Sequence, residues 1–231
     1  FTMLNDFIES TTLDDIRNGK IILIDKPIEW TSFDVIKYIR KSIQTRLKVK
    51  KIKVGHAGTL DPLATGLLII CIGKETKNIS KYQDLSKKYT GIIKLGETTP
   101  SYDRETEIDE TYDYDHVDEN KVLKISKKFI GRQKQLPPIY SALKKDGKRM
   151  YKYAREKIKI DIEPREIEVY DFQILNFSKP HIEFIIECSK GTYIRSIAND
   201  YGKKLNSGSH LYKLKRISIG DFSISDALRL E

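Results

Sequence analysis

The segment GHAGTLDPLATG, residues 55–66, constrains the fold more than any other part of the chain. Its three glycines and one proline are typical of a loop rather than of a helix or a strand. It runs directly into LLIICIG at 67–73, an apolar run that predicts a buried strand. A second apolar run, GKIILID at 19–25, predicts a strand that stops at Lys26-Pro27. The glycine-rich segment should therefore be a loop held by buried strands, where a side chain can be positioned rigidly.

Helix and strand signals are mixed along the rest of the chain. Thr31 and Asp34 have the spacing of a capping box, and apolar residues follow them at helical spacing. RLKVKKIKV at 46–54 alternates basic and apolar residues, which predicts a strand with a cationic face. No regular βαβ rhythm appears, so we expect an α+β fold with a mixed, mostly antiparallel sheet, flanked by helices and loops, in a single domain over 1–231. Further strands are predicted at 87–96, 166–177, 181–189 and 214–222, with a hairpin joining the middle two, and further helices at 78–87, 120–131 and 192–205.

The charge of the chain is unevenly distributed. Lys and Arg number 42 against 33 Asp and Glu, a net charge of +9. Nine acidic residues and one Arg lie in 103–119, which is predicted to form an exposed loop, so the rest of the chain carries a net charge of +17. Such a surface suits a polyphosphate partner, although a generally lysine-rich surface would have the same composition.

Cysteine usage and hydropathy exclude several classes of protein. Cys71 and Cys188 lie in apolar runs and are predicted to be buried reduced thiols of a cytoplasmic protein. With four histidines and no close Cys/His cluster, no metal site is expected. The longest apolar run, 67–72, is far shorter than the ~20 residues of a membrane helix, and the N-terminal residues lack a signal-peptide pattern.

Asp61 lies within the glycine-rich loop, and Pro62 restricts it to extended conformations. From the residues alone two interpretations are open: a carboxylate held at the mouth of a cleft, or an Asp-Pro turn that only connects strands. A phosphate-binding loop would also use glycines. That pattern requires Gly-Lys-Ser/Thr at its end, whereas Leu67 follows Gly66 here.

Four segments, in order along the chain, resemble the tRNA pseudouridine synthase B (TruB) family. GHAGTLDPLATGLLII is similar to the family's catalytic loop without a gap, and LIDKPIEWTS to its N-terminal motif. QLPPIYSALKKDGKRMYKYAR resembles its RNA-gripping insertion, placed here at about 135–165, and CSKGTYIRSIANDYG resembles its second active-site motif. The resemblance implies the pseudouridine synthase fold and isomerisation of uridine 55 in the TΨC arm of tRNA, without cofactor or metal.

Members of this family cut the bond between uracil N1 and ribose C1′, turn the base and rejoin it through C5. The resemblance makes Asp61 the catalytic carboxylate, which either attacks C1′ or removes a ribose proton, and both routes stay open. An anion beside a developing oxocarbenium-like ribose is also favourable electrostatically. The uridine must leave the RNA stack before a carboxylate can reach it, so base flipping is implied.

Other positions match functional residues of the family. Tyr89, in KKYTG, matches a tyrosine that stacks on the flipped base and takes the C5 proton. Tyr193 matches a second substrate-contacting tyrosine, and Arg195 an arginine that pairs with the catalytic Asp and keeps it ionised. His56 matches a histidine that fills the place of the flipped base or stacks beside it, and Leu214 an apolar residue that packs on the uracil.

Basic residues supply the remaining expectations. Lys26 either touches the phosphate backbone or pairs with Asp25. Segment 144–159 carries eight Lys or Arg interleaved with tyrosines, which suits an RNA clamp and also an exposed charged loop. The expected contacts with the RNA backbone come from Lys144, Lys145, Lys148 and Arg149.

The family often carries a C-terminal RNA-binding (PUA) domain, and this chain is expected to be a short form without one. We expect a cytoplasmic monomer that acts on the tRNA TΨC stem-loop. One alternative is the catalytic subunit of a guide-RNA-dependent synthase, which shares the Asp loop but normally has the C-terminal domain. Another is a non-catalytic RNA-binding or RNA-folding protein. The joint presence of Asp61, Tyr89, Tyr193 and Arg195 favours an enzyme.

Overall fold

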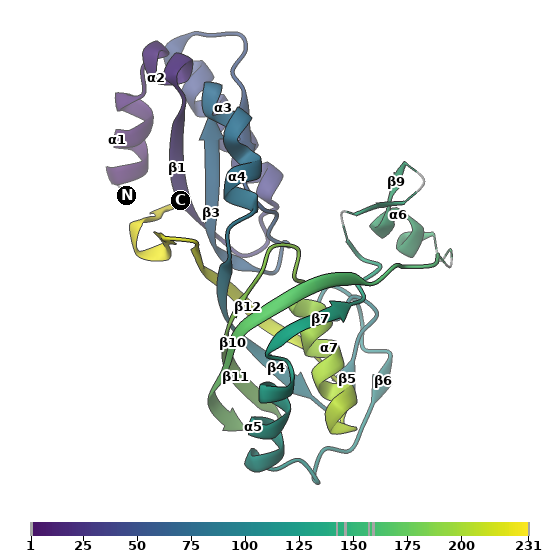
Figure 1. Ribbon diagram of the computed structural model, residues 1–231. Coiled ribbons are helices and arrows are strands. Elements are labelled where there is room, and N and C mark those ends of the chain that lie inside the picture. The colour runs from purple at the N-terminus through teal and green to yellow at the C-terminus, as the bar shows by residue number, and fades with distance from the viewer. Residues whose placement is uncertain (1, 142, 146, 157, 159, 231) are drawn as a thin grey trace. The chain divides into compact units, whose positions relative to one another are not determined.

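The computed structural model describes residues 2–141, 143–145, 147–156, 158 and 160–230. Figure 1 shows its helices and strands. The chain forms two compact units, which are described separately below. Unit 1 comprises residues 1–89 and 214–231, and unit 2 comprises residues 90–213.

The sheet of unit 1 has the strand order β14-β1-β3-β12, with β2 also paired to β3 and β13 to β12. β1 and β2 run antiparallel to β3, as β13 does to β12. The pairs β1–β14 and β12–β3 are parallel. The elements are α1 (Thr2–Ser10), α2 (Leu13–Asn18), β1 (Lys20–Lys26), α3 (Ser32–Leu47), β2 (Val54–His56), β3 (Thr65–Ile72), the 3₁₀ helix η1 (Gly73–Asn78), α4 (Ile79–Gln83), β13 (Phe222–Ser223), the 3₁₀ helix η2 (Ile224–Asp226) and β14 (Leu228–Arg229).

β3 is apolar throughout because both of its faces are buried. Leu68 and Ile70 belong to the core that lies under α1 and α3, together with residues of β1. Leu67 and Ile69 point to the opposite face and form a second cluster with Ile219. A strand covered on both sides has no solvent-facing positions, so its sequence cannot alternate with polar residues. The buried strand predicted at 67–73 is thus confirmed.

α3 confirms the capping box and corrects the prediction that follows it. The Thr31 hydroxyl accepts a hydrogen bond from the Asp34 amide, and the Asp34 carboxylate accepts one from the Thr31 amide. The strand predicted at 46–54 is wrong, because α3 continues to Leu47, which packs on the core. The helix ends where Lys48 takes a left-handed conformation, with φ of 53°. After the end of α3, the chain does not pair with β3 until Val54–His56, which form β2.

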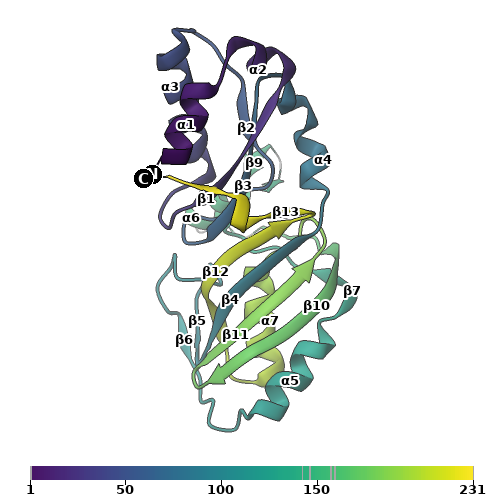
Figure 2. The same cartoon turned by 90° about the vertical axis from the view of Figure 1, so that its left-hand side faces the viewer.

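In unit 2, β4, β11, β10 and β7 lie side by side in that order, as Figure 2 shows. The β10–β11 hairpin and the β7–β10 pair are antiparallel, which confirms the predicted hairpin and the mostly antiparallel character. Two small two-stranded sheets, β5–β6 and β8–β9, are also present. The elements are β4 (Lys87–Leu95), which begins in unit 1, β5 (Glu97–Thr98), β6 (Glu110–Thr111), α5 (Glu119–Lys128), β7 (Gly131–Gln135), β8 (Lys144–Lys145), β9 (Lys148–Arg149), α6 (Met150–Arg155), β10 (Arg165–Ser178), β11 (His181–Cys188), α7 (Ile194–Leu205) and β12 (Ser209–Ile219), which ends in unit 1.

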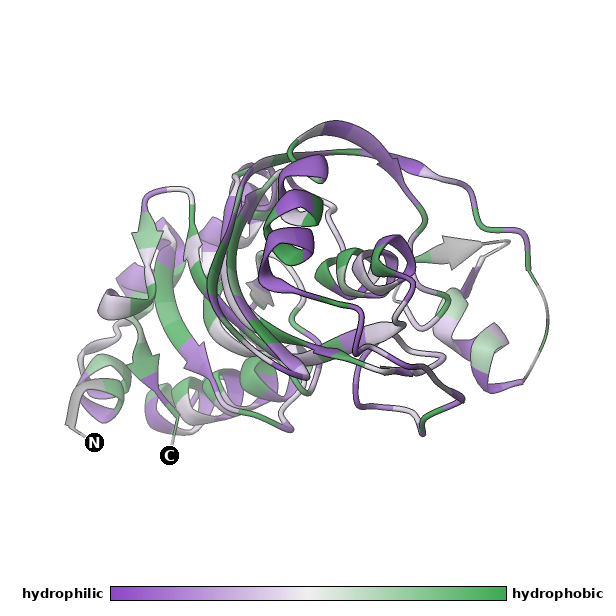
Figure 3. Ribbon diagram, turned by 90° about the horizontal axis from the view of Figure 1, so that it is seen from below, coloured by the Kyte–Doolittle hydropathy of each residue, from purple (hydrophilic) through white to green (hydrophobic). Residues whose placement is uncertain are grey.

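Aromatic side chains form the core of unit 2. The Phe129 ring stacks on Tyr201 of α7 with centroids 5.7 Å apart, and Phe172 of β10 meets Phe184 of β11 edge to face at 5.6 Å. Tyr201 is fully buried, and its hydroxyl donates to the Val122 carbonyl of α5. α5 buries Val122 and Ile125, whereas α7 is buried over most of its length, polar residues included. Figure 3 shows hydrophobic and hydrophilic residues, green and purple, following one another along the helices.

Three further segments differ from prediction in part. The helix predicted at 78–87 is shorter, because η1 precedes it and α4 ends at Gln83. The final strand begins earlier, at Ser209, and turns at Gly220 into β13. Segment 103–119 is largely an exposed loop, as predicted, but Asp103 and Val117 are buried. The overall α+β class with a mixed, mostly antiparallel sheet is confirmed.

Candidate active site

The loop that carries Asp61 is fixed at both ends by backbone pairing. Its first end follows β2, where the Ala57 amide donates to the Ile69 carbonyl at 2.9 Å. Asp61 itself starts a tight turn, since the Ala64 amide donates to its carbonyl at 3.0 Å. Thr65 then opens β3. Asp61 is half-buried in the described structure.

Ser32 holds the residue next to Asp61. Its hydroxyl accepts from the Leu60 amide at 2.9 Å and donates to the Leu60 carbonyl at 3.1 Å. Ser32 is the first residue of α3 and is 2% exposed, so neither bond is shared with solvent. The start of α3 and the Asp61 loop are thereby joined.

Arg216 holds the two sides of the same loop. Its Nε donates to the Leu67 carbonyl at 2.8 Å and its Nη2 to the Gly58 carbonyl at 2.9 Å. The side chain is 1% exposed. Gly66 pairs with Arg216 across the β12–β3 ladder and has φ of 106°. A Cβ on Gly66 would lie 2.2 Å from the Arg216 carbonyl oxygen, which explains why glycine is needed there.

Lys26 is fully buried and organises the loop after β1. Its Nζ donates to the carbonyls of Pro27 at 2.9 Å, Trp30 at 2.5 Å and Pro62 at 3.3 Å. Burial lowers the pKa of Lys26 to about 8, and the charge of Asp61 opposes this shift. The carboxylate of Asp25 meets Lys215 at 3.7 Å. The described geometry of Lys26 is therefore that of a positioning residue, and its contact with a phosphate stays a prediction.

Three other residues predicted to contact the substrate lie in unit 1: His56, Leu214 and Tyr89. Burial, followed by the nearby charge of Arg216, lowers the pKa of His56, which is thus neutral at physiological pH. Leu214 is half-buried on β12, and its carbonyl accepts a bond of 3.4 Å from the Thr65 hydroxyl beside the Asp61 turn. Tyr89 lies on β4 and is 8% exposed. Their contacts with a base stay predictions.

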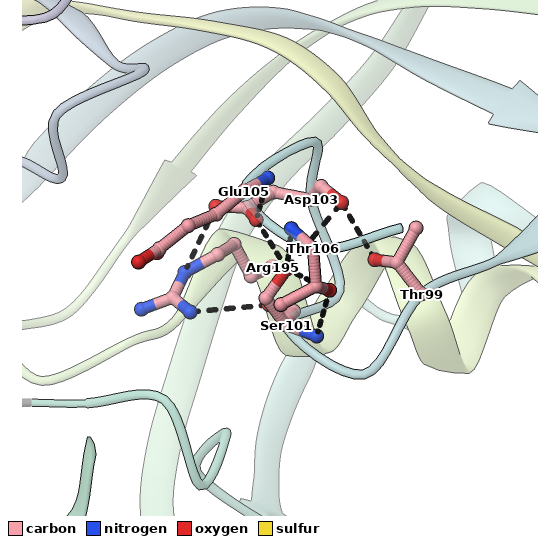
Figure 4. A network of polar contacts seen from close by, with 6 residues as sticks. All are labelled: Thr99, Ser101, Asp103, Glu105, Thr106 and Arg195. Carbon is pink, nitrogen blue, oxygen red and sulfur yellow. Dashed lines mark hydrogen bonds and ion pairs between the residues drawn. The ribbon is translucent and has the colours of Figure 1, made fainter. Parts of the chain in front are cut away.

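Arg195 lies in a network of polar contacts in unit 2 (Figure 4). It lies in the first turn of α7 and is 3% exposed. Its Nη1 donates to the Ser101 carbonyl at 3.1 Å, and its Nε lies 3.9 Å from the Asp103 carboxylate. Removing either member of this pair would leave the other charge buried and uncompensated, which is strongly destabilising. The pairing of Arg195 with Asp61 stays a prediction.

The loop that presents Asp103 is rigidly bonded within itself, as Figure 4 shows. The Asp103 carboxylate accepts from the Ser101 hydroxyl at 2.6 Å and from the Glu105 amide at 2.9 Å. The Thr99 hydroxyl donates to the Asp103 carbonyl at 2.6 Å, and Ser101 and Thr106 bond each other through both hydroxyls and backbone amides. The position of Asp103 beside Arg195 is thus fixed before any substrate binds.

Tyr193 is held by its backbone. The Gln135 side chain accepts from the Tyr193 amide at 2.8 Å and donates to the Tyr193 carbonyl at 3.0 Å. Gln135 ends β7 and is 5% exposed. These two bonds fix the backbone of Tyr193 at the N-terminus of α7, and its side chain is half-buried.

The insertion is described except for residues 142, 146, 157 and 159, and the side chains of Lys144 and Lys145 lie outside the described part. Lys148 forms an ion pair with Glu156, and its Nζ lies 4.8 Å from the ring centroid of Tyr153. Arg149 is exposed on β9. Lys148 is one of the four cations expected to contact RNA, and in the structure it already contacts Glu156 and Tyr153 of the insertion.

Four positioning residues were not predicted from the sequence: Ser32, Asp103, Gln135 and Arg216. The Ser and Thr residues packed around Asp103 in TPSYDRET were the one local signal of a structured loop. The other three act across long sequence separations, which a local pattern does not register.

A metal-binding cluster and a membrane-spanning helix are both absent from the part of the chain that the structure describes. The described residues contain no group of three or more His, Cys, Asp or Glu side chains that could hold a metal ion. Over the same part of the chain, no helix is long and apolar enough to cross a membrane.

Known proteins similar to this chain include tRNA pseudouridine synthases of other organisms. A protein of Flavobacterium johnsoniae named tRNA pseudouridine synthase B is 49% identical over 218 residues, which cover 94% of this chain and 95% of that protein. A protein of the same name from Phocaeicola vulgatus is 46% identical, with 94% and 92% covered. Among solved structures, a chain of a Cbf5-Nop10-Gar1 complex matches with a TM-score of 0.70 and 26% identity. The match covers 96% of this chain but only 56% of that one.

The family comparison covers parts of both units. Residues 41–194 match the family described as "TruB family pseudouridylate synthase (N terminal domain)". This range includes the Asp61 loop, Tyr89, the insertion and Tyr193. The chain belongs to the TruB family of pseudouridylate synthases.

Proposed function

We propose that this enzyme isomerises uridine 55 in the TΨC arm of tRNA to pseudouridine, with Asp61 as the catalytic carboxylate. One observation carries the choice of substrate: two relatives named tRNA pseudouridine synthase B match at 49% and 46% identity over more than nine-tenths of their length. The solved chain from the Cbf5-Nop10-Gar1 complex is only 26% identical, and this chain spans 56% of it. A stand-alone tRNA enzyme is therefore favoured over a subunit that depends on guide RNA.

The reaction conserves atoms. The glycosidic bond from N1 to C1′ breaks, a bond from C5 to C1′ forms, the proton on C5 is lost to solvent, and N1 gains one. Asp61 either attacks C1′ or removes a ribose proton. In both routes the carboxylate must be placed within tenths of an ångström of its target. The bonds that fix Leu60, Gly58 and Leu67 support this role, because they hold the loop from both sides.

The remaining roles follow the family resemblance. Tyr89 stacks on the flipped base and accepts the C5 proton, Tyr193 contacts the substrate, and Arg195 is the partner of the catalytic carboxylate. Leu214 packs on the uracil. His56 takes the place of the flipped base in the RNA stack, a role that suits its lowered pKa because a neutral ring stacks without the cost of desolvating a charge.

The insertion grips the RNA through Lys144, Lys145, Lys148 and Arg149. Neutralising all four together should weaken RNA binding and flatten its dependence on salt by about one unit of slope per lost phosphate contact. Because Lys148 is already paired with Glu156, its share should be smaller than that of Arg149. An unchanged salt slope would remove the insertion from the RNA contact.

We further propose that the protein acts as a cytoplasmic monomer, in a single catalytic domain built from both units. Its reaction needs no cofactor.

The test is tritium release from a T-arm stem-loop labelled at uridine C5, with the native protein and Asp61→Asn. Loss of the C5 proton reports the isomerisation directly. Release by the native protein, absent in Asp61→Asn while RNA binding persists, is the expected result. No release by the native protein from a folded hairpin, at concentrations that bind it, would refute guide-free activity.

A further inference from the structure

Unit 1 contains a surface pocket of about 750 Å³ that is lined by basic and neutral residues. It is formed by the ends of α2 and η1, the second half of α3 and the loop at 48–53, and Figure 1 shows α2 and α3 at the same end of unit 1. None of the acidic residues in the described ranges lines it. Its cationic lining residues are Arg17, Arg40, Lys50, Lys51, Lys53, Lys74 and Lys77.

Within the described residues, no carboxylate forms an ion pair with the lysines of this basic pocket. Arg17 pairs with Asp14 at 3.3 Å on the exposed rim. Arg40 donates to the Val54 carbonyl, which leaves its charge uncompensated. None of the five lysines takes part in an ion pair among the described residues, and all five are exposed.

Glu75, the acidic residue of η1, forms hydrogen bonds with residues outside the pocket lining. Glu75 accepts from the Asn78 amide group at 3.1 Å and from the Tyr82 hydroxyl at 2.6 Å, and it does not line the pocket. The cationic side chains that line the pocket repel one another, and together they create a positive electrostatic potential inside it. A polyanion that enters it relieves this repulsion and releases counterions.

The basic pocket is separate from Asp61. Ser32 at the start of α3 touches Leu60, whereas Gln44, twelve residues along α3, lines the pocket. At 1.5 Å per residue this spans about 18 Å. β3 gives an independent measure, because Thr65 lies beside the Asp61 turn and Gly73 lines the pocket. Eight residues of strand span roughly 26 Å. A uridine at Asp61 therefore cannot place its own phosphate in the pocket.

We propose that this basic pocket is a second RNA-binding site, which holds backbone phosphates of the tRNA about 20 Å from the modified uridine. The inference rests on the proposed function only for the identity of the RNA. The site contributes affinity without sequence specificity, because lysine ammonium groups read phosphates and not bases. It acts on binding and not on the chemical step.

The test compares two double variants that remove the same charge from unit 1. Lys51→Gln with Lys53→Gln alters the pocket, and Lys41→Gln with Lys81→Gln alters exposed lysines that do not line it. The affinity for full-length unmodified tRNA is measured between 50 and 200 mM KCl. Two phosphate contacts contribute about 1.4 to 1.8 to the logarithmic salt slope, so the native protein should lose about tenfold more affinity over this range than the pocket variant.

The control variant should keep the native slope, and the rate of pseudouridine formation at saturating tRNA should be native in both. Equal slopes for the pocket and control variants would overturn the proposal. So would a pocket variant that slows the saturated rate with a native slope. Failure of the proposed function is a different result: the native protein would then release no tritium, whereas the difference in salt slope would still be measured.

Discussion

Replacing Arg216 with lysine tests whether the fork of its guanidinium holds the Asp61 loop. The substitution keeps the charge but offers one ammonium in place of a planar group that reaches two carbonyls at once. Arg216 now bonds Leu67 at 2.8 Å and Gly58 at 2.9 Å, at 1% exposure. Losing one such bond costs about 1.5–3 kcal/mol, since a buried carbonyl is left without a donor. That is a large part of the ~5–15 kcal/mol that stabilises a typical domain.

The single tryptophan makes this cost measurable in unit 1 alone. Trp30 packs against the core of unit 1, so its fluorescence follows the unfolding of that unit in urea. With a slope of about 2 kcal/mol per molar urea, a loss of ~2 kcal/mol lowers the midpoint by roughly 1 M. The turnover number should fall at least about tenfold with little change in KM, because a displaced carboxylate weakens the chemical step more than RNA binding.

Arg40→Lys is the matched control. Arg40 makes one bond to the Val54 carbonyl, at 3.0 Å, and is only half-buried. It should lose less than about 1 kcal/mol, because water can replace the missing donor. If Arg216→Lys were as stable as Arg40→Lys and turned over at the native rate, the loop would not depend on Arg216.

Three more predictions concern the same unit. Ser32→Ala removes both bonds to Leu60 and should lower the free energy of unfolding by about 1–3 kcal/mol and slow turnover, whereas Ser42→Ala, which loses one bond to the Tyr38 carbonyl, should do neither strongly. Gly66→Ala forces a Cβ to 2.2 Å from the Arg216 carbonyl oxygen, so it should cost more than about 4 kcal/mol; soluble protein with a native urea midpoint would contradict the tight contact. Burial lowers the pKa of Lys26 from the ordinary lysine value of 10.5 to about 8, so between these pH values the unfolded chain binds more protons and stability should rise with pH, by at most about 3 kcal/mol. Urea midpoints from pH 7.5 to 10 should show this rise in the native protein relative to Lys26→Met, and parallel profiles would refute it.

The sequence by itself determined the elements whose cause is local. The capping box at Thr31 and Asp34 starts α3, the turn between residues 178 and 181 allows the β10–β11 hairpin, and the apolar stripe of α7 covers its sheet. Helix caps, short turns and side-chain periodicity each involve residues only a few positions apart, so they can be read from the order of the residues. The glycine pattern around Asp61 likewise requires a loop, and it carries the resemblance to the TruB family.

Tertiary structure decided what depends on distant residues. Segment 46–54 alternates as a strand would, but the core receives Leu47 from the end of α3 and Val54 from the start of β2, and a loop connects them. Arg216 reaches Gly58 across 158 positions, and Gln135 reaches Tyr193 across 58. Lysines from separate segments became one basic pocket only when α2, α3 and η1 packed together. A buried polar group takes whichever partner the fold brings near it, and the sequence around that group does not contain the partner.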